Sequence, residues 1–241
     1  MKPIIGIIGP RCYDKDNPFK NKTTFNDNFS KRIVEAGGIP VGILFPFEKF
    51  NEDLLNLCDG LIFQGGPHLG SSHICAMHYA YKHKIPVLGI CLGMQTMAGY
   101  EWYLKKFPNE LSYEQIEKNF KYEDEKEYLY DKDGHDNLNP FNINKIDMCK
   151  HEVVLSKNSK LCNIFKNKII DMPSLHKSVV KEDLFKDSIF NATGYTKDGI
   201  IEVLESKNGL MIGVQFHPEL EDKNLILFKE FINMCKFDKK Q

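Results

Sequence analysis

A cysteine lies between two glycines directly after an apolar run, in residues 87–95 (VLGICLGMQ), and a helix-compatible segment follows. This pattern is typical of the cysteine form of a nucleophile elbow, in which a strand reverses into a helix within about two residues and strains the central residue. Gly89 and Gly93 omit Cβ atoms that would collide with the neighbouring strand or helix. The helix N-terminus beside the sulfur favours a thiolate. We therefore expect Cys91 to be a nucleophile, although a free cysteine is often only a small buried apolar residue.

A histidine and a carboxylate follow a second apolar run at 210–215. His217 lies just beyond this run, and Glu219 can face the same way if the chain stays extended. Pro218 favours that extension, because it disfavours helical geometry in the preceding residue. By itself, a histidine beside a proline turn is more often a surface residue. Together with the elbow, it predicts nucleophile, base and orienting carboxylate in the chain order Cys, His, Glu.

Short apolar strands alternate with helical stretches in the first half of the chain, which is typical of a parallel sheet covered by helices. We expect strands at 4–8, 40–44, 60–63, 87–90, 153–155, 188–193, 200–205 and 210–215, and helices at 25–36, 72–83, 92–100 and 224–235. Sites in such sheets form beyond the carboxyl ends of the strands. Gly66, Cys91 and His217 each follow a strand, so we expect them at one edge.

Residues 89–95 (GICLGMQ) and 214–219 (VQFHPE) resemble the class I glutamine amidotransferase superfamily. Further segments resemble one branch of this superfamily, the gamma-glutamyl hydrolases related to gamma-glutamyl-GABA hydrolase. These segments are residues 2–7, 35–41, 59–66, 174–179 and 198–202. The resemblance covers most of residues 1–100 and 148–236. It implies an α/β fold: a three-layer, flavodoxin-like domain with an open, mostly parallel sheet and helices on both faces.

The chain departs from the hydrolase branch at three places. Residues 67–70 (PHLG) replace an aspartate and a longer acidic, tyrosine-bearing loop after the Gly-Gly pair. The elbow reads Cys-Leu-Gly where the branch often has Cys-Arg-Gly, and Lys177 and Ser178 replace a usual His-Gln. These changes keep the residues of acyl transfer but leave the leaving amine unidentified.

The resemblance implies hydrolysis of a gamma-glutamyl amide through a thioester on Cys91. His217 moves the proton between sulfur, amine and water, and Glu219 fixes the imidazole. Backbone N–H groups of Leu92 and Gly66 are expected to receive the oxyanion.

The resemblance also suggests substrate contacts. Gln95 lies one helical turn after Cys91 and can line the same pocket, although a polar helix residue can also face solvent. Gly65 and His176 are expected to face the substrate. His68 is a candidate to replace the missing aspartate of the loop. Without the resemblance, His176 would be taken for a surface residue.

Composition limits the classes of partner. The chain has 241 residues, is 42% hydrophobic and carries a net charge of −1, which predicts a single domain over 1–241 and gives no basis for a nucleic-acid partner. No apolar run approaches the roughly 20 residues that span a bilayer, so we expect no membrane contact. An odd count of seven cysteines favours a reducing cytoplasm over a disulfide scaffold.

No metal or other cofactor is expected from sequence motifs, because CxxC and HExxH patterns are absent from the sequence. Four histidines recur every five residues, a spacing that does not keep them on one helical face: His68, His73, His78 and His83.

Residues 101–147 form an excursion that the resemblance does not cover. They are rich in Lys, Glu, Tyr and Phe, which fits either a solvated surface segment or a lid over the site.

Three functions remain open from the sequence. The leading hypothesis is a free-standing hydrolase of gamma-glutamyl-GABA or related gamma-glutamyl amines, with a small-molecule substrate and a homodimer left open. The alternative is a glutaminase subunit that supplies ammonia to a partner synthase. The third is a sensor that binds a glutamyl ligand without turnover, against which the intact catalytic residues count.

Overall fold

A nine-stranded mixed sheet runs through the centre of the protein, in the order β4-β1-β5-β6-β13-β12-β11-β8-β9. The computed structural model describes residues 1–12, 17–46, 49–133, 135 and 150–237. The strands of this sheet are β1 (Ile4–Ile8), β4 (Ile39–Ile43), β5 (Gly60–Phe63), β6 (Val87–Ile90), β8 (Lys150–Leu155), β9 (Ile169–Pro173), β11 (Phe190–Tyr195), β12 (Ile201–Ser206) and β13 (Met211–Val214). Two small pairs lie outside it: β2 (Arg11–Cys12) with β3 (Lys22–Thr23), and β7 (Leu129–Asp131) with β10 (Ser178–Val180).

The sheet has a parallel part and an antiparallel extension. Strands β4, β1, β5, β6 and β13 are parallel neighbours. Strands β12, β11, β8 and β9 then each run antiparallel to the strand before them. Every residue of β5, β6 and β13 is buried, as expected of parallel strands covered on both faces.

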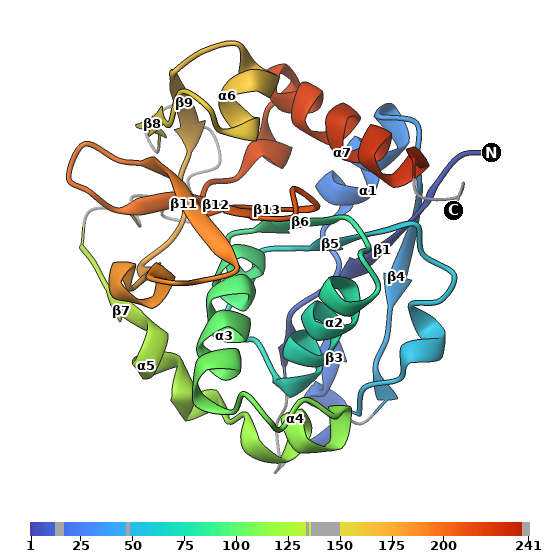
Figure 1. Cartoon of the computed structure of the whole chain (residues 1–241). Coiled ribbons are helices and arrows are strands. Elements are labelled where there is room, and N and C mark those ends of the chain that lie inside the picture. The colour runs from blue at the N-terminus through green and yellow to red at the C-terminus, as the bar shows by residue number, and fades with distance from the viewer. Residues whose placement is uncertain (13–16, 47–48, 134, 136–149, 238–241) are drawn as a thin grey trace.

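Helices cover both faces of the sheet and complete three layers (Figure 1). The α-helices are α1 (Asp27–Glu35), α2 (Ser71–Lys82), α3 (Leu92–Lys106), α4 (Tyr113–Asn119), α5 (Glu125–Tyr128), α6 (Lys160–Phe165) and α7 (Leu225–Phe237). Helices α1, α6 and α7 lie on one face, and α2 and α3 lie on the other with α4 and α5 beyond them. The structure therefore confirms the expected three-layer α/β fold.

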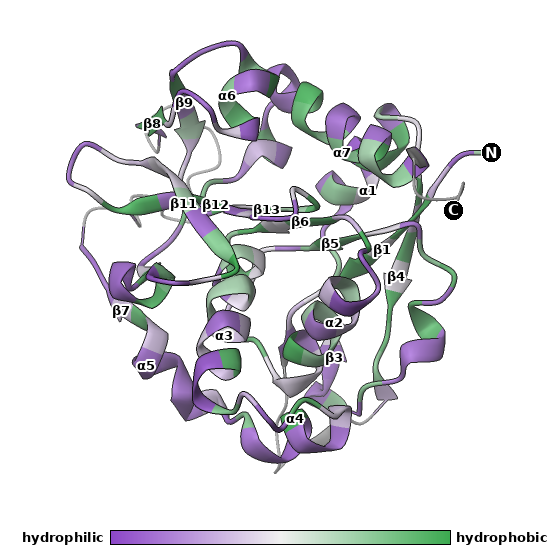
Figure 2. Ribbon diagram, in the orientation of Figure 1, coloured by the Kyte–Doolittle hydropathy of each residue, from purple (hydrophilic) through white to green (hydrophobic). Residues whose placement is uncertain are grey.

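Two hydrophobic core clusters lie on the two faces of the sheet. Alternation along β5 shows the division: Leu61 and Phe63 belong to the cluster under α2 and α3, whereas Ile62 belongs to the cluster under α1 and α7. This alternation follows from the two-residue period of a strand. In Figure 2 the central strands are largely hydrophobic, while the helices carry both hydrophobic and hydrophilic residues. None of the helices in the described ranges is both long and apolar enough to cross a membrane.

The strands expected at 4–8, 60–63 and 87–90 match β1, β5 and β6 residue for residue. The nucleophile helix is longer than expected, because α3 continues beyond residue 100 to Lys106 and buries Trp102 and Tyr103.

The first part of the excursion is packed rather than solvated. Ile116, Phe120 and Tyr128 are buried in the core cluster on the α3 face. Residues 134 and 136–147, in the later part of the excursion, lie outside the described residues.

Candidate active site

Three adjacent strands of the parallel sheet end at the candidate site. Gly65 and Gly66 follow β5, Cys91 follows β6, and His217 lies three residues beyond the end of β13. The N–H of Cys91 donates a hydrogen bond of 2.8 Å to the carbonyl oxygen of Val214, which ties the elbow to β13. The neighbouring order β5-β6-β13 thus brings the sequence motifs to one edge, as expected.

The backbone of Cys91 has the strained geometry of an elbow. Its φ and ψ are 54° and −105°, and it is the N-cap residue of α3. A Cβ on Gly89 would lie 2.7 Å from the carbonyl carbon and oxygen of Gly93, and a Cβ on Gly93 would lie 2.3 Å from the carbonyl oxygen of Phe63. Both glycines therefore allow α3 to pack directly on the strands. Between them, Cys91 has the unfavourable backbone conformation.

The imidazole of His217 contacts the carboxylate of Glu219, with 2.7 Å between Nδ1 and Oε1. Both residues are buried. The expected extended chain does not form here: Pro218 instead starts a 3-10 helix, η7 (Pro218–Leu220). Proline suits the first position of a helix, where its missing N–H leaves no bond unmade. The single turn still returns Glu219 to the imidazole.

The electrostatic surroundings of His217 favour its charged form. Burial lowers the pKa of this histidine, but the charges of Glu219 and Cys91 outweigh the burial and raise the pKa well above its ordinary value. Its Nε2 is buried and has no aligned hydrogen-bond partner among the described residues. Such loose geometry is common before substrate binds. The arrangement suits an imidazolium beside the sulfur of Cys91.

Gly65 marks the place where cysteine and histidine converge. A Cβ built on this glycine would lie 2.9 Å from Cε1 of His217 and 3.3 Å from Cβ of Cys91. The loop after β5 therefore touches both side chains at one point. No larger residue fits at position 65 without displacing one of them.

The two oxyanion candidates directly follow Cys91 and Gly65 in the chain. Leu92 is the first residue of α3, and the first N–H groups of a helix have no partner within the helix. Gly66 is held against Pro10, since a Cβ on it would lie 2.3 Å from that ring.

Gln95 and His176 are buried beside the sheet edge. The amide nitrogen of Gln95 donates to the carbonyl oxygen of Ser178 at 3.0 Å and lies 3.3 Å from Oε1 of Gln215. His176 instead lies 3.2 Å from the carboxylate of Glu202. Their roles as substrate contacts remain predictions.

Arg32 supports the turn that carries the carboxylate, and sequence motifs did not point to it. Its buried guanidinium donates from Nε to the carbonyl oxygen of Glu219 at 3.0 Å. Nη1 contacts Glu35 at 2.8 Å and Asp222 at 2.7 Å. An arginine inside an otherwise apolar helix face was the only available signal.

His68 connects the loop after β5 to the excursion. Its Nδ1 lies 3.1 Å from the hydroxyl of Tyr122. Both residues line a cavity of about 540 Å³ beside the loop, with Arg11, Glu117 and Lys121 among the other lining residues. None of the three proposed catalytic residues lines this cavity, but the loop that carries Gly66 forms one of its walls.

Residues 19–234 match the family model described as glutamine amidotransferase class-I. A protein of Schizosaccharomyces pombe, provisionally named glutamine amidotransferase PB2B2.05, is 29% identical over 239 residues, covering 88% of this chain and 83% of that protein. A glutamine-hydrolysing component of the GMP synthase of Saccharolobus solfataricus is 23% identical, covering 84% of this chain and 89% of that component.

A CTP synthase of Hydrogenobaculum is 28% identical, but the match covers 80% of this chain and only 37% of the synthase. Among solved structures, the glutaminase domain of Trypanosoma brucei CTP synthase with bound acivicin superposes with a TM-score of 0.66. That match is 16% identical and covers 98% of this chain and 94% of the domain, so it supports the fold.

Proposed function

The chain belongs to the class I glutamine amidotransferase family, and on this premise we propose that it hydrolyses gamma-glutamyl amide bonds with Cys91 as nucleophile. The observation that carries the proposal is the convergence of Cys91 and His217 against Gly65, with Glu219 bonded to the far side of the imidazole. Nucleophile, base and orienting carboxylate in this arrangement are the requirements of covalent acyl transfer.

The first half of the reaction transfers the gamma-glutamyl group to sulfur. The thiolate of Cys91 attacks the amide carbonyl carbon, and the oxygen becomes an oxyanion. We propose that the N–H groups of Leu92 and Gly66 receive it, and each such donor typically contributes about 2.7–4 kcal/mol of transition-state stabilisation. His217 then gives its proton to the departing nitrogen, and an amine and a thioester result.

The second half returns the enzyme to its resting state. Neutral His217 takes a proton from water, and the hydroxide attacks the thioester carbonyl. The carbon–sulfur bond breaks, glutamate leaves, and Cys91 and His217 regain their charges. Glu219 holds the imidazole in the tautomer that both halves need.

The leaving amine is proposed to be larger than ammonia. The cavity beside the Gly66 loop has a volume of about 540 Å³ and is lined by both basic and acidic side chains, including Arg11, Lys121 and Glu117. Ammonia needs no such space, whereas an amino acid or a charged amine does. We propose that this cavity receives the leaving group, which favours a gamma-glutamyl amine such as gamma-glutamyl-GABA as substrate, as in the hydrolase branch that the sequence resembles.

The alternative is a glutaminase that supplies ammonia to a partner synthase. The relatives from Hydrogenobaculum and Saccharolobus are named as a CTP synthase and as part of a GMP synthase, which favours this second function. Under it, glutamine would be the substrate and activity would depend on the partner.

One hydrolysis screen separates the two functions. Purified protein is incubated with glutamine, gamma-glutamyl-GABA, gamma-glutamyl polyamines and folyl-polyglutamate, and release of each amine is measured. We expect kcat/KM to be highest for a gamma-glutamyl amine. Hydrolysis of glutamine alone would select the glutaminase function, and absence of any turnover together with an unreactive Cys91 would reject both.

A further inference from the structure

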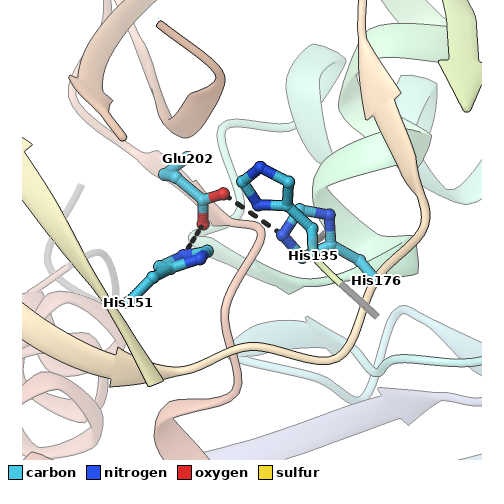
Figure 3. A group of neighbouring side chains, drawn as sticks. All are labelled: His135, His151, His176 and Glu202. Carbon is cyan, nitrogen blue, oxygen red and sulfur yellow. Dashed lines mark ion pairs between the residues drawn. The ribbon is translucent and has the colours of Figure 1, made fainter. Parts of the chain in front are cut away.

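Four side chains from separate parts of the chain point toward one another (Figure 3). His151 belongs to β8, Glu202 belongs to β12, His176 lies between β9 and β10, and His135 follows β7. Each offers one ligand atom, and these atoms all lie within 4.8 Å of one another. The spacing of these four residues along the sequence matches no known metal-binding motif, so a motif search does not detect the group.

The geometry of the group is that of converging electron-pair donors. Nε2 of His151 and Nε2 of His176 each lie 3.2 Å from an oxygen of Glu202. Among the described residues, neither nitrogen and neither oxygen has a hydrogen bond of acceptable alignment. The carboxylate of Glu202 is fully buried and forms an ion pair with each of these imidazoles when they are protonated, and a buried carboxylate needs such a cationic partner or a metal ion.

We propose that His135, His151, His176 and Glu202 bind a divalent transition metal ion, with Zn²⁺ as the best match. Three imidazoles and one carboxylate form a tetrahedral donor set that Zn²⁺ accepts. With metal–ligand bonds of about 2.0–2.2 Å, the ligand atoms of a tetrahedron lie about 3.3–3.6 Å apart. The four ligand atoms lie within 4.8 Å of one another, and the imidazoles of His151 and His176 are each 3.2 Å from a different oxygen of Glu202, so the side chains rotate inward when they take up an ion.

An outer contact of His135 supports metal binding through its other nitrogen. Nε2 of His135 lies 3.3 Å from Oδ2 of Asp198, whereas its Nδ1 is buried without a hydrogen-bond partner in the described ranges. Metal-bound histidines usually donate their second N–H to a carboxylate or carbonyl, which fixes the ring. Asp198 is therefore the expected outer partner of a metal bound to Nδ1.

The position of the site suggests a structural ion that steadies the catalytic edge. The N–H of His217 donates to the carbonyl oxygen of Pro173 at 2.8 Å, three residues before His176. The N–H of Gln215 donates to the carbonyl oxygen of Glu202 at 2.9 Å. An ion held by His176 and Glu202 would join the two segments that these bonds connect to His217.

Metal binding is tested on the full-length protein by a measurement that does not need the substrate. Chelator-treated protein is titrated with Co²⁺ and followed by absorption spectroscopy, and protein reloaded with Zn²⁺ is analysed for metal content. We expect one equivalent per chain, visible bands of tetrahedral Co²⁺ that Zn²⁺ removes, and a melting temperature that rises with free Zn²⁺. Lack of a one-equivalent endpoint, or a thiolate charge-transfer band from a cysteine ligand, would overturn the proposal.

Variants then locate the ion. Asp198→Asn keeps the size of an outer partner and is expected to weaken Zn²⁺ binding about 10–100-fold. His135→Ala removes a ligand and is expected to weaken it further. His83→Ala changes an exposed histidine at the end of α2 and should leave affinity unchanged. If His135→Ala bound Zn²⁺ with wild-type affinity, the assignment would be overturned. If His135→Ala does not fold, the affinity of Asp198→Asn provides the test instead.

Discussion

Nδ1 of His217 lies 2.7 Å from Oε1 of Glu219, although a 3-10 turn and not an extended strand separates the two residues. The backbone of this turn is held as well, because Arg32 donates to the Glu219 carbonyl oxygen. The turn therefore has one fixed geometry, and the imidazole it orients has a pKa well above its ordinary value. The chemical consequences of this pair can be measured.

We predict that Glu219→Gln shifts the alkaline limb of the kcat/KM–pH profile to lower pH. The negative charges of Glu219 and Cys91 raise the His217 pKa against the effect of burial, so the imidazolium that protonates the amine survives to higher pH. Removing one nearby opposite charge typically shifts a pKa by about 1–3 units, here downward. An unchanged limb in the folded variant would mean that the carboxylate has no part in charging the histidine.

Loss of the base should be more severe than loss of the orienting carboxylate. His217→Asn is expected to be nearly as inactive as a nucleophile variant, whereas Glu219→Gln keeps measurable turnover, because the carboxylate acts through the histidine. Steady-state kcat values of the two purified variants provide the comparison. Equal inactivity in both folded proteins would assign another role to Glu219.

We predict that Cys91→Ala folds but loses turnover by a factor on the order of a million. An electrophilic glutamine analogue such as acivicin should give one adduct on wild-type protein, at Cys91, when peptides are analysed by mass spectrometry. Cys58 and Cys75 are buried, and burial raises the pKa of the Cys58 thiol to about 11, so they serve as internal controls. An adduct on either of them with Cys91 unmodified would reject the nucleophile.

The strain at the elbow predicts a difference between two inactive variants. Cys91 has a φ of 54°, a conformation that costs of the order of 1–3 kcal/mol for a residue with a Cβ. Cys91→Gly removes that strain but adds about 0.5–1 kcal/mol of backbone entropy loss on folding. The glycine variant should therefore be more stable than Cys91→Ala by up to about 2 kcal/mol in denaturant unfolding. A more stable alanine variant would show that the elbow is unstrained.

Much of this site was predictable because its signals are local. Gly89, Cys91 and Gly93 lie within five residues, and their apolar flanks fix strand, turn and helix together. His217 could be placed at the same edge because it follows a strand, and parallel strands share the edge at which they end.

Contacts between distant segments could not be predicted in the same way. His135, His151 and Glu202 come together only through the pairing of the antiparallel strands, and Arg32 reaches Glu219 across 187 positions of the chain. The packed part of the excursion was missed for a related reason: Ile116 and Phe120 lie among many charged residues, and their burial depends on α2 and α3 as partners.

The stability of the excursion should depend on the protonation of Glu125. Burial raises the pKa of this carboxyl to about 7, against the lowering effect of the Leu69 N–H. The carboxyl of Glu125 therefore keeps its proton in the folded state up to a higher pH than in the unfolded chain. The free energy of unfolding falls as pH rises from about 4.5 to about 7, and it does not change further above that range. Glu125→Gln should be as stable as wild type near pH 4 and more stable near pH 8. Thermal melts across this range test the slope, with Glu123→Gln as the exposed control.

Tyr122 should take part in choosing the leaving amine. Its hydroxyl contacts His68 on the Gly66 loop, and both residues line the 540 Å³ cavity. The excursion cannot be tested by deletion, because Ile116 and Tyr128 belong to the core, so a point variant is the better probe. Losing one hydrogen bond of about 0.5–1.5 kcal/mol changes a rate roughly 2–12-fold. We therefore predict that Tyr122→Phe alters the ratio of kcat/KM for gamma-glutamyl-GABA and glutamine several-fold, while the rate of Cys91 alkylation stays constant.

Tyr130→Phe is the control for this prediction. Tyr130 is a half-exposed residue of β7 that does not line the cavity, so its substitution should leave the ratio unchanged. If wild type, Tyr122→Phe and Tyr130→Phe all gave the same ratio, the cavity would have no part in substrate selection, and ammonia would be favoured as the leaving group.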